Sequence, residues 1–195
     1  CLQTLLAEHA VEMALPEVYD RFLGRGFDAV ADHLRGTPAG LPQDFRRRFE
    51  TAVENAFSRS LQPMPGIRAL LLALTVPYCL ASSSSRERIA LSLSVTGLQE
   101  LFAGRIFAGE MVERGKPAPD LFLHAAKAMG AGPARCLVIE DSGPGIAAGR
   151  AAGMTVWAFA GGSHLGGGDA RARLTASGAA RVFDRMDDLK RALAG

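Results

Sequence analysis

The apolar residues of this chain change their spacing once, near residue 62, and that change restricts the possible folds most. Up to about residue 62 they recur every three or four positions, which is the spacing of amphipathic helices. From Met64 onward, short β-type runs (VPYCLA, RIFAG, CLVIE and MTVWAFA) alternate with helical patterns. Such alternation predicts a parallel sheet covered by helices. We therefore expect a helical domain over residues 1–62 and an α/β domain over residues 63–195.

Composition narrows the class of protein. A chain of 195 residues with 48% hydrophobic content can bury one sizeable core beside a smaller module. Its 22 basic and 20 acidic residues give a net charge of +2, so no overall field favours nucleic acid or an anionic membrane. No apolar run reaches the roughly 18 residues that span a bilayer. The cysteines, Cys1, Cys79 and Cys136, are odd in number and widely spaced, which is typical of reduced thiols in a cytoplasmic protein.

Parallel sheets bind ligands at the carboxyl ends of their strands, and three segments of the chain place polar residues there. The first is LASSSSR, residues 80–86, between the run VPYC and a helical pattern. Hydroxyls and main-chain N–H groups at a helix start can bind an anion, which makes Ser82, Ser83 and Ser84 candidate phosphate ligands. Taken alone, the segment is explained equally well by a plain serine cap of the helix.

The second segment is RGKPAPD, residues 114–120. Pro117 restricts the backbone of Lys116, and the next helix is expected to begin at the second proline, so the lysine should lie on a stiff turn. An ammonium group held in this way suits a phosphoryl oxygen. The alternative is an ordinary solvated loop lysine.

The third segment is CLVIEDSGPGIAAG, residues 136–149. Four apolar residues predict a fully buried strand, and Glu140 and Asp141 follow at its carboxyl end. Adjacent acids repel each other unless a cation compensates them, so a hard divalent ion such as Mg²⁺ is the natural partner. The alternative is that Asp141 only caps the next helix and Glu140 is solvated.

The glycines of this third segment also resemble a dinucleotide-binding fingerprint. In that motif a pyrophosphate occupies the turn after the strand, where an acidic pair would repel it. The motif further needs an acid about twenty residues on, and residues 158–162 supply none. The acidic pair therefore favours a cation site over a dinucleotide site.

Taken together, the three segments resemble the haloacid dehalogenase superfamily, in particular its phosphatases and its β-phosphoglucomutase-like members with a helical cap. LASSSS is similar to the second motif of that superfamily, GKPAPDLF to the third, and VIEDSGPGI with GRAAGM to the fourth. The similarity covers essentially the whole chain. It implies an α/β fold with a doubly wound, Rossmann-like parallel sheet and an inserted all-helical cap domain.

The resemblance also implies roles for individual residues. Ser82 would hydrogen-bond the transferring phosphoryl group, and Lys116 would neutralise that group. Asp141 would hold Mg²⁺, with Glu140 beside it or acting through water. The Gly24-Arg25-Gly26 stretch of the cap would face the site and select the substrate.

Two features depart from the superfamily pattern. Its first motif, a strand ending in Asp-x-Asp that supplies the nucleophile, is not found in residues 1–195, and the acids Asp20, Asp28 and Asp32 lie on helical patterns. We therefore expect the nucleophile strand upstream of Cys1, and without it the sheet should be split with unpaired backbone on both sides. In the second departure, Phe27 stands near the place where related sugar phosphomutases have a phosphate-gripping arginine, and Arg25 comes slightly early.

These expectations lead to a magnesium-dependent phosphatase that acts through a phosphoaspartate on a small phosphorylated metabolite of the sugar phosphate, phosphogluconate or phosphoglycolate type. Two alternatives stay open at this point: a β-phosphoglucomutase-like phosphomutase, and a non-catalytic phosphate-binding module. The oligomeric state, monomer or dimer, is not readable from the sequence. The glycine-rich residues 161–173 predict a mobile surface loop, with His164 as a residue next to the site.

Overall fold

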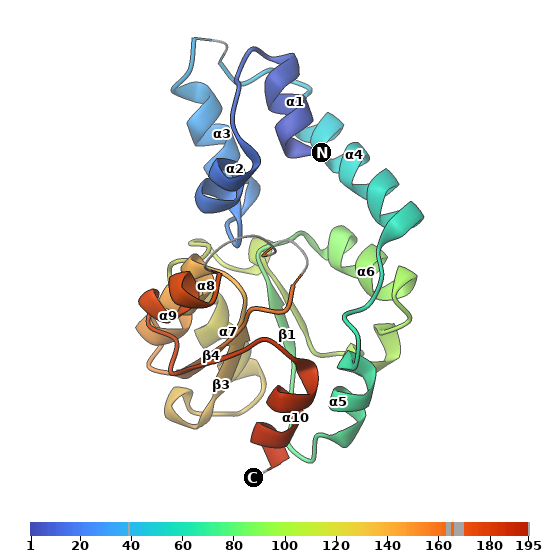
Figure 1. Cartoon of the computed structure of the whole chain (residues 1–195), viewed down its shortest axis with the longest axis vertical. Helices are drawn as coiled ribbons and strands as arrows, with labels where there is room; N and C mark the ends of the chain where they lie inside the picture. The colour runs from blue at the N-terminus through green and yellow to red at the C-terminus, as the bar shows by residue number, and fades with distance from the viewer. Residues whose placement is uncertain (39, 163–164, 166–169, 195) are drawn as a thin grey trace.

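The computed structural model describes residues 1–38, 40–162, 165 and 170–194. A helical cap lies above an α/β core, and the long helix α4 descends from the cap towards the core helix α6 (Figure 1). The cap helices are α1 (Leu2–Glu8), α2 (Leu15–Phe22), α3 (Phe27–Arg35) and α4 (Phe45–Ser60). No strand occurs in residues 1–38 and 40–62, in accordance with the helical spacing of the sequence.

The cap helices form because each presents one apolar stripe to a shared cluster. In α2, Pro16 lies in the first turn, where it costs no hydrogen bond, and Val18 and Phe22 lie one turn apart on the buried side. Val30 and Leu34 repeat this spacing in α3. The cluster between the helices contains the buried side chains of Leu5, Leu6, Val18, Phe22, Val30, Leu34 and Phe45.

The core contains five short parallel strands in two sheets within the described residues. β1 (Leu80–Ser82) pairs with β2 (Ile106–Ala108), and the second sheet has the order β3 (Leu137–Glu140), β4 (Thr155–Phe159), β5 (Arg181–Phe183). The core helices are α5 (Ile67–Ala73), α6 (Arg86–Val95), α7 (Asp120–Ala128), α8 (Gly143–Ala151), α9 (Ala170–Ala176) and α10 (Met186–Ala194). Short 3-10 turns lie at Gln99–Phe102, Gly109–Met111 and Pro133–Arg135. The predicted α/β fold with parallel strands is confirmed.

The strand β3 is exposed on one side, which corrects the prediction of a fully buried strand. Val138 and Glu140 are buried, but Leu137 and Ile139 are 37% and 41% exposed. The cause is the position of β3 at the edge of its sheet. In the described part of the chain β3 pairs only with β4, and β1 pairs only with β2, so the sheet is split between β1 and β3.

Three further differences concern the ends of the predicted elements. The first strand is shorter than the run VPYCLA, because it begins at Leu80. The strand β5 was not predicted, since RVF is too short to give an alternating pattern. In the glycine-rich stretch, residues 163–164 and 166–169, including His164, lie outside the described residues, whereas 170–173 form the first turn of α9 and not a loop.

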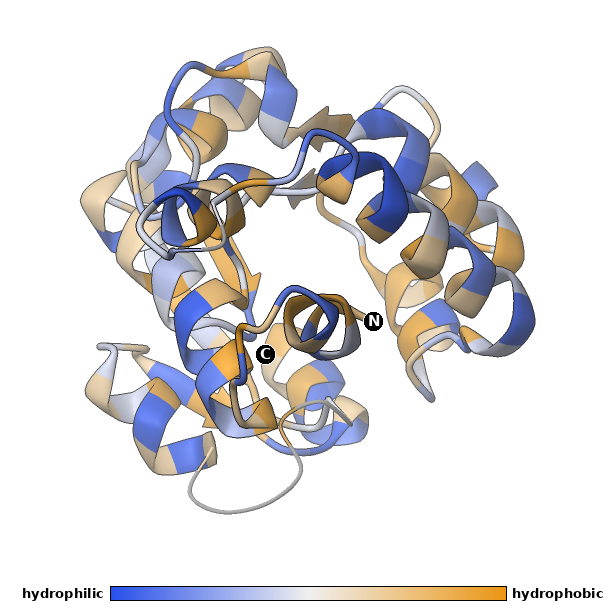
Figure 2. Cartoon of the chain, turned by 90° about the horizontal axis from the view of Figure 1, so that it is seen from above, coloured by the Kyte–Doolittle hydropathy of each residue, from blue (hydrophilic) through white to orange (hydrophobic). Residues whose placement is uncertain are grey.

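The cap helices α2 to α4 are amphipathic, as the spacing of apolar residues in the sequence predicts. Hydrophobic and hydrophilic residues alternate along the helices (Figure 2), and no helix in the described ranges is long and apolar enough to cross a membrane. All three cysteines are free. Cys1 is exposed, while Cys79 and Cys136 are only half-buried.

Candidate functional site

The polar segments predicted from the sequence meet where β1 and β3 end, below the cap (Figure 1). Ser82 is the last residue of β1 and Glu140 is the last residue of β3. Lys116 contacts both Ala81 in β1 and Glu140 at the end of β3, so the loops after these strands lie at the same edge of the core. That edge is where parallel sheets place ligands.

The serines at and after the end of β1 have two structural roles: one caps the next helix, and another bonds within the loop. Ser85 is the N-cap of α6, where its hydroxyl accepts a hydrogen bond from the Arg88 N–H at 3.4 Å. The Ser82 hydroxyl accepts from the Ser84 N–H at 3.2 Å, which curls the loop around the end of β1. The plain-cap alternative therefore applies to Ser85, and Ser82 to Ser84 are left to other contacts.

Lys116 is buried between the two sheets. Its side chain is 5% exposed, and its ammonium donates to the Ala81 carbonyl at 3.3 Å and forms an ion pair with Glu140. The ammonium also lies 4.5 Å from the centre of the Phe122 ring, a favourable cation–π contact. The alternative of a solvated loop lysine is thus wrong.

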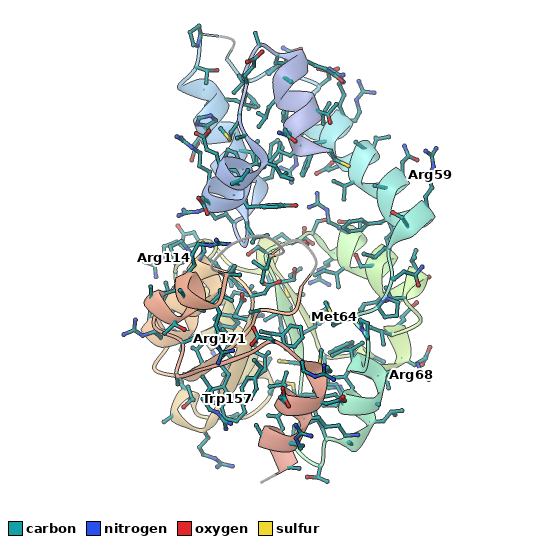
Figure 3. All side chains as sticks on the ribbon, in the orientation of Figure 1. Arg59, Met64, Arg68, Arg114, Trp157 and Arg171 are labelled. Atoms are coloured by element: carbon teal, nitrogen blue, oxygen red, sulfur yellow. The ribbon has the colours of Figure 1, made fainter. Side chains whose placement is uncertain are left out.

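The turn that carries Lys116 is fixed by a bidentate pair. Arg114 donates from Nε and Nη2 to the two carboxylate oxygens of Asp120 at 2.9 and 2.8 Å. This hydrogen-bonded pair raises the pKa of Arg114 and lowers the pKa of Asp120. Arg114 lies at the level where cap and core meet, above Trp157 in the core (Figure 3). The pair joins two residues six positions apart, on either side of Lys116, and so holds its backbone.

The acidic loop is also held by a network. One oxygen of Glu140 pairs with Lys116, and the other accepts from the Ser142 hydroxyl at 3.0 Å and from the Asp141 N–H at 3.2 Å. Ser142 is in turn the N-cap of α8, accepting from the Gly145 N–H at 3.2 Å. The alternative in which Asp141 caps the helix and Glu140 is solvated is wrong, because Ser142 is the cap and Glu140 is buried.

Ser142 and Gly145 shape the acidic loop, and their contacts with Glu140 were not predicted from the sequence. A Cβ atom on Gly145 would overlap the Glu140 carboxylate, so only glycine leaves room for this buried acid. The sequence does contain a signal for the Ser142 cap. Ser142 lies three residues before Gly145 at the start of a helical pattern, which is the spacing of an N-cap serine and its N3 partner.

The donor set at this edge fits a hard cation in part. Asp141 lines a cavity of about 160 Å³ together with Ser142 and the cap residues Tyr19, Asp20 and Leu23. Within the described ranges, no group of three or more His, Cys, Asp or Glu side chains is arranged to hold a metal. Mg²⁺ commonly takes one or two protein carboxylates and completes its shell with water and phosphate oxygens. Asp141 can supply that carboxylate. Glu140 is held beside it by Lys116 and by the Ser142 hydroxyl.

The cap reaches the site through the turn between α2 and α3. Gly24 in this turn has φ of 78°, and its carbonyl accepts a hydrogen bond from the Ser83 hydroxyl at 3.0 Å. A Cβ atom on Gly24 would overlap the Ser142 hydroxyl. Arg25 follows as an exposed residue, with its N–H donating to the Phe22 carbonyl at 3.1 Å. The structure therefore brings Gly24 into contact with two predicted site segments.

Fold and site together define a class, a parallel α/β core whose strand-end loops carry a buried ammonium, serines and two carboxylates under a helical cap. Residues 5–153 match the haloacid dehalogenase-like hydrolases. The chain is 29% identical over 163 residues to 6-phosphogluconate phosphatase of Escherichia coli K12, covering 83% of this chain and 74% of that protein.

Solved structures agree with the sequence match. A haloacid dehalogenase-like protein from Agrobacterium tumefaciens superposes with a TM-score of 0.81 at 33% identity, covering 98% of this chain and 87% of that one. A hydrolase of the same family from Deinococcus radiodurans, solved with phosphate and sodium bound, gives a TM-score of 0.72 at 39% identity, with 99% and 86% covered. This chain belongs to the haloacid dehalogenase-like hydrolase family, and the resemblance stated from its motifs is confirmed.

Proposed function

We propose that this chain provides most of a magnesium-dependent phosphatase for a small phosphorylated metabolite. The observation that carries the proposal is the buried Lys116, whose ammonium lies between the Ala81 carbonyl at β1 and the Glu140 carboxylate at β3. A lysine is rarely buried without a charged partner, and this one is held at the ligand-binding edge of the sheet. It therefore places a fixed positive charge where a phosphoryl group would lie.

The neighbouring groups suit the same ligand. We assign the Ser82 hydroxyl and the main chain of the loop through Ser83 and Ser84 to binding the phosphoryl oxygens, with Lys116 neutralising their charge. The pairing of Lys116 with Glu140 keeps the ammonium oriented. When bound, Mg²⁺ would supply charge neutralisation on the phosphoryl oxygens, with Asp141 as its ligand and Glu140 acting on it through water. The cap residues Gly24 and Arg25 would face the leaving group.

The nucleophile is the group that the described site does not supply. Two aspartates directly follow strands, Asp141 after β3 and Asp184 after β5. Asp184 pairs with the Arg171 guanidinium and lies two strands away from Glu140, across β4. We propose that an aspartate carried by a strand outside residues 1–195 lies between β1 and β3 and attacks phosphorus. The ester P–O bond then breaks, a second aspartate of the same strand protonates the leaving oxygen, and water hydrolyses the phosphoaspartate to aspartate and inorganic phosphate. The split between the sheets and the exposed Leu137 and Ile139 support this placement.

Hydrolysis is favoured over phosphoryl transfer between sugar hydroxyls by the surroundings of Phe27. Its ring packs within the cap, with centroids 6.4 Å from Phe45 and 6.0 Å from Phe49, and the Arg46 guanidinium lies over it at 5.2 Å. Phe27 therefore belongs to the cap core and offers no charge to a second phosphate. A relative that acts on 6-phosphogluconate supports a phosphorylated sugar acid or sugar as the substrate class.

Phosphate release by the full-length natural protein tests the proposal. With Mg²⁺, we expect stoichiometric release of inorganic phosphate from 6-phosphogluconate or hexose phosphates, and from p-nitrophenyl phosphate. Asp141→Asn should lower this activity by at least about a hundredfold, because the amide replaces the charged metal ligand. Formation of an isomeric ester without phosphate release would instead identify a mutase, and phosphate binding without turnover would identify a binding module.

A further inference from the structure

Gly24 of the cap contacts both loops of the site at once. Its carbonyl accepts the hydrogen bond from Ser83, which follows β1, and its Cα lies against the Ser142 hydroxyl, which follows β3. Since β1 and β3 belong to different sheets, this one residue spans the split in the core. The position of the cap turn is therefore coupled to both strand-end loops.

The contact with Ser142 reaches the charged pair. The Ser142 hydroxyl donates to Glu140, which pairs with Lys116, and Lys116 donates to the carbonyl of Ala81, two residues before Ser83. These contacts form a ring: they lead from Gly24 through the acidic loop and Lys116 to the serine loop, and Ser83 of the serine loop bonds back to Gly24. Each hydrogen bond in this ring has a partly or fully buried environment, which makes its geometry specific.

The cap and core are also joined on another side, by side chains. The Arg88 guanidinium of α6 stacks over the Phe49 ring of α4 at 5.2 Å. A contact of this kind tolerates sliding, because a cation over a ring face has no single direction. The Ser83 hydrogen bond is directional and lies at the turn that carries Arg25. We therefore take it as the contact that fixes the position of this turn over the core.

We propose that Ser83 is a positioning residue, whose hydroxyl fixes the Gly24-Arg25 turn of the cap over the site and thereby determines how well the leaving group of the substrate is held. The expected effect on KM rests on the phosphatase function proposed above, whereas the effect on the position of the cap turn does not. Ser83 was expected from the sequence to bind phosphate, and its hydroxyl is instead directed at the Gly24 carbonyl. The phosphoryl group itself is then left to Ser82, Lys116 and the main chain of the loop.

The experiment compares Ser83→Ala with Ser83→Thr, which keeps the hydroxyl, and with Ser94→Ala at an exposed position of α6 as the matched control. Amide hydrogen exchange of residues 23–26 in the full-length protein reports the cap turn directly. Steady-state kinetics with a sugar phosphate, and inhibition by inorganic phosphate, report the site. These readouts separate positioning of the cap from binding of the phosphoryl group.

In Ser83→Ala we expect exchange at residues 23–26 to accelerate by about three- to tenfold, as loss of a single net hydrogen bond predicts. KM for the sugar phosphate should rise by a similar factor, while the inhibition constant of inorganic phosphate changes by less than about twofold. Ser83→Thr should restore exchange and KM, and Ser94→Ala should leave both unchanged.

Unchanged exchange at residues 23–26 in Ser83→Ala would overturn the proposal. An equal weakening of inorganic phosphate inhibition and of KM would overturn it too, because the hydroxyl would then be a phosphate ligand. If the protein hydrolyses no phosphate ester, the phosphatase proposal fails, but the exchange measurement still decides the role of Ser83. The two failures are therefore distinguishable.

Discussion

In the core, Lys116 and Glu140 are buried and paired with each other, whereas the cap reaches the same loops through the main chain of one glycine. Lys116 and Glu140 have side chains that are 5% and 8% exposed, and each holds the other in place. Arg25, the charged residue next to the cap contact, is exposed. The core therefore keeps a fixed charge pattern, while the cap can leave its contact without separating buried charges.

This difference suits a division of labour between the two regions. Charge stabilisation of a phosphoryl group needs groups that are already oriented, and burial in the core provides that orientation. Admission and release of a metabolite need an element that moves at low cost, and a few hydrogen bonds and ring contacts provide that freedom. The comparison can be tested by removing one contact in each region and measuring what is lost.

The largest effect is expected from Lys116→Met in the core. The substitution leaves the Glu140 carboxylate buried without its cation, and breaking a buried ion pair in this way typically costs about 3–5 kcal/mol of unfolding free energy. Denaturant unfolding followed by circular dichroism measures the loss. Adding Glu140→Gln should recover part of it, because the double variant buries no unpaired charge.

Lys127→Met provides the matched control on the exposed side of α7. It removes the same charge and keeps a similar side-chain length where solvent surrounds the ammonium, so a change of no more than about 0.5 kcal/mol is expected. Equal losses from Lys116→Met and Lys127→Met would show that burial of the pair contributes nothing. Core and cap would then not differ in how strongly their contacts at the site contribute to stability.

A smaller effect is expected from Gly24→Ala in the cap. The left-handed backbone at φ 78° costs a side-chain-bearing residue about 1–2 kcal/mol. The new methyl group also overlaps the Ser142 hydroxyl. Because the cap can tilt away, we expect a loss of about 1–2 kcal/mol in unfolding free energy together with a raised KM for a sugar phosphate.

Gly26→Ala is the control for this prediction, two residues along the same turn. Its φ is −72°, and a Cβ atom there has no neighbour within 4 Å. Its unfolding free energy should stay within about 0.5 kcal/mol of the natural protein. If both alanines act alike, the cap turn responds to any substitution and the specific contact with Ser142 is not the cause.

The sequence was sufficient for the alternation of elements and for the three loops of the site. Ser82 and Glu140 end strands and Lys116 directly precedes a proline, so short-range patterns located them and parallel-strand geometry placed them together. The pairing between Lys116 and Glu140 was not predicted, because it joins residues 24 positions apart across two sheets. Local spacing carries no information on such a contact.

The exposed face of β3 and the role of Ser83 were not predicted from the sequence, for related reasons. An apolar run such as CLVIE is read as buried when a neighbouring strand is assumed on each side, and β3 has one paired neighbour in the described chain. Ser83 was read with its serine neighbours as part of an anion site. Its contact with Gly24 depends on how the cap, 59 residues earlier in sequence, is placed over the core.

The smallest effect is expected from Arg114→Ala, which removes an exposed guanidinium from its pair with the half-buried Asp120. The variant tests whether a charged pair matters when its cation is not buried. The Arg114 hydrogen bond lowers the pKa of Asp120 from its ordinary value of 3.8. A carboxyl group with a lowered pKa in the folded state adds stability above pH 3.8, and this is lost as the pH falls through the lowered pKa. The variant should therefore be slightly less stable than the natural protein at pH 7 and no different at the acid end of this range.

Two measurements check this last expectation, denaturant midpoints at pH 7 and at acid pH, and an NMR titration of the Asp120 carboxyl group. The titration should show the pKa of Asp120 moving up towards 3.8 in the variant. Arg59→Ala, at an exposed arginine on the opposite side of the molecule in Figure 3, is the control and should leave that pKa in place. A loss at pH 7 as large as that of Lys116→Met would mean that the turn around Lys116, more than burial of its ammonium, holds the site together. The core would then depend on a surface contact in the same way as the cap.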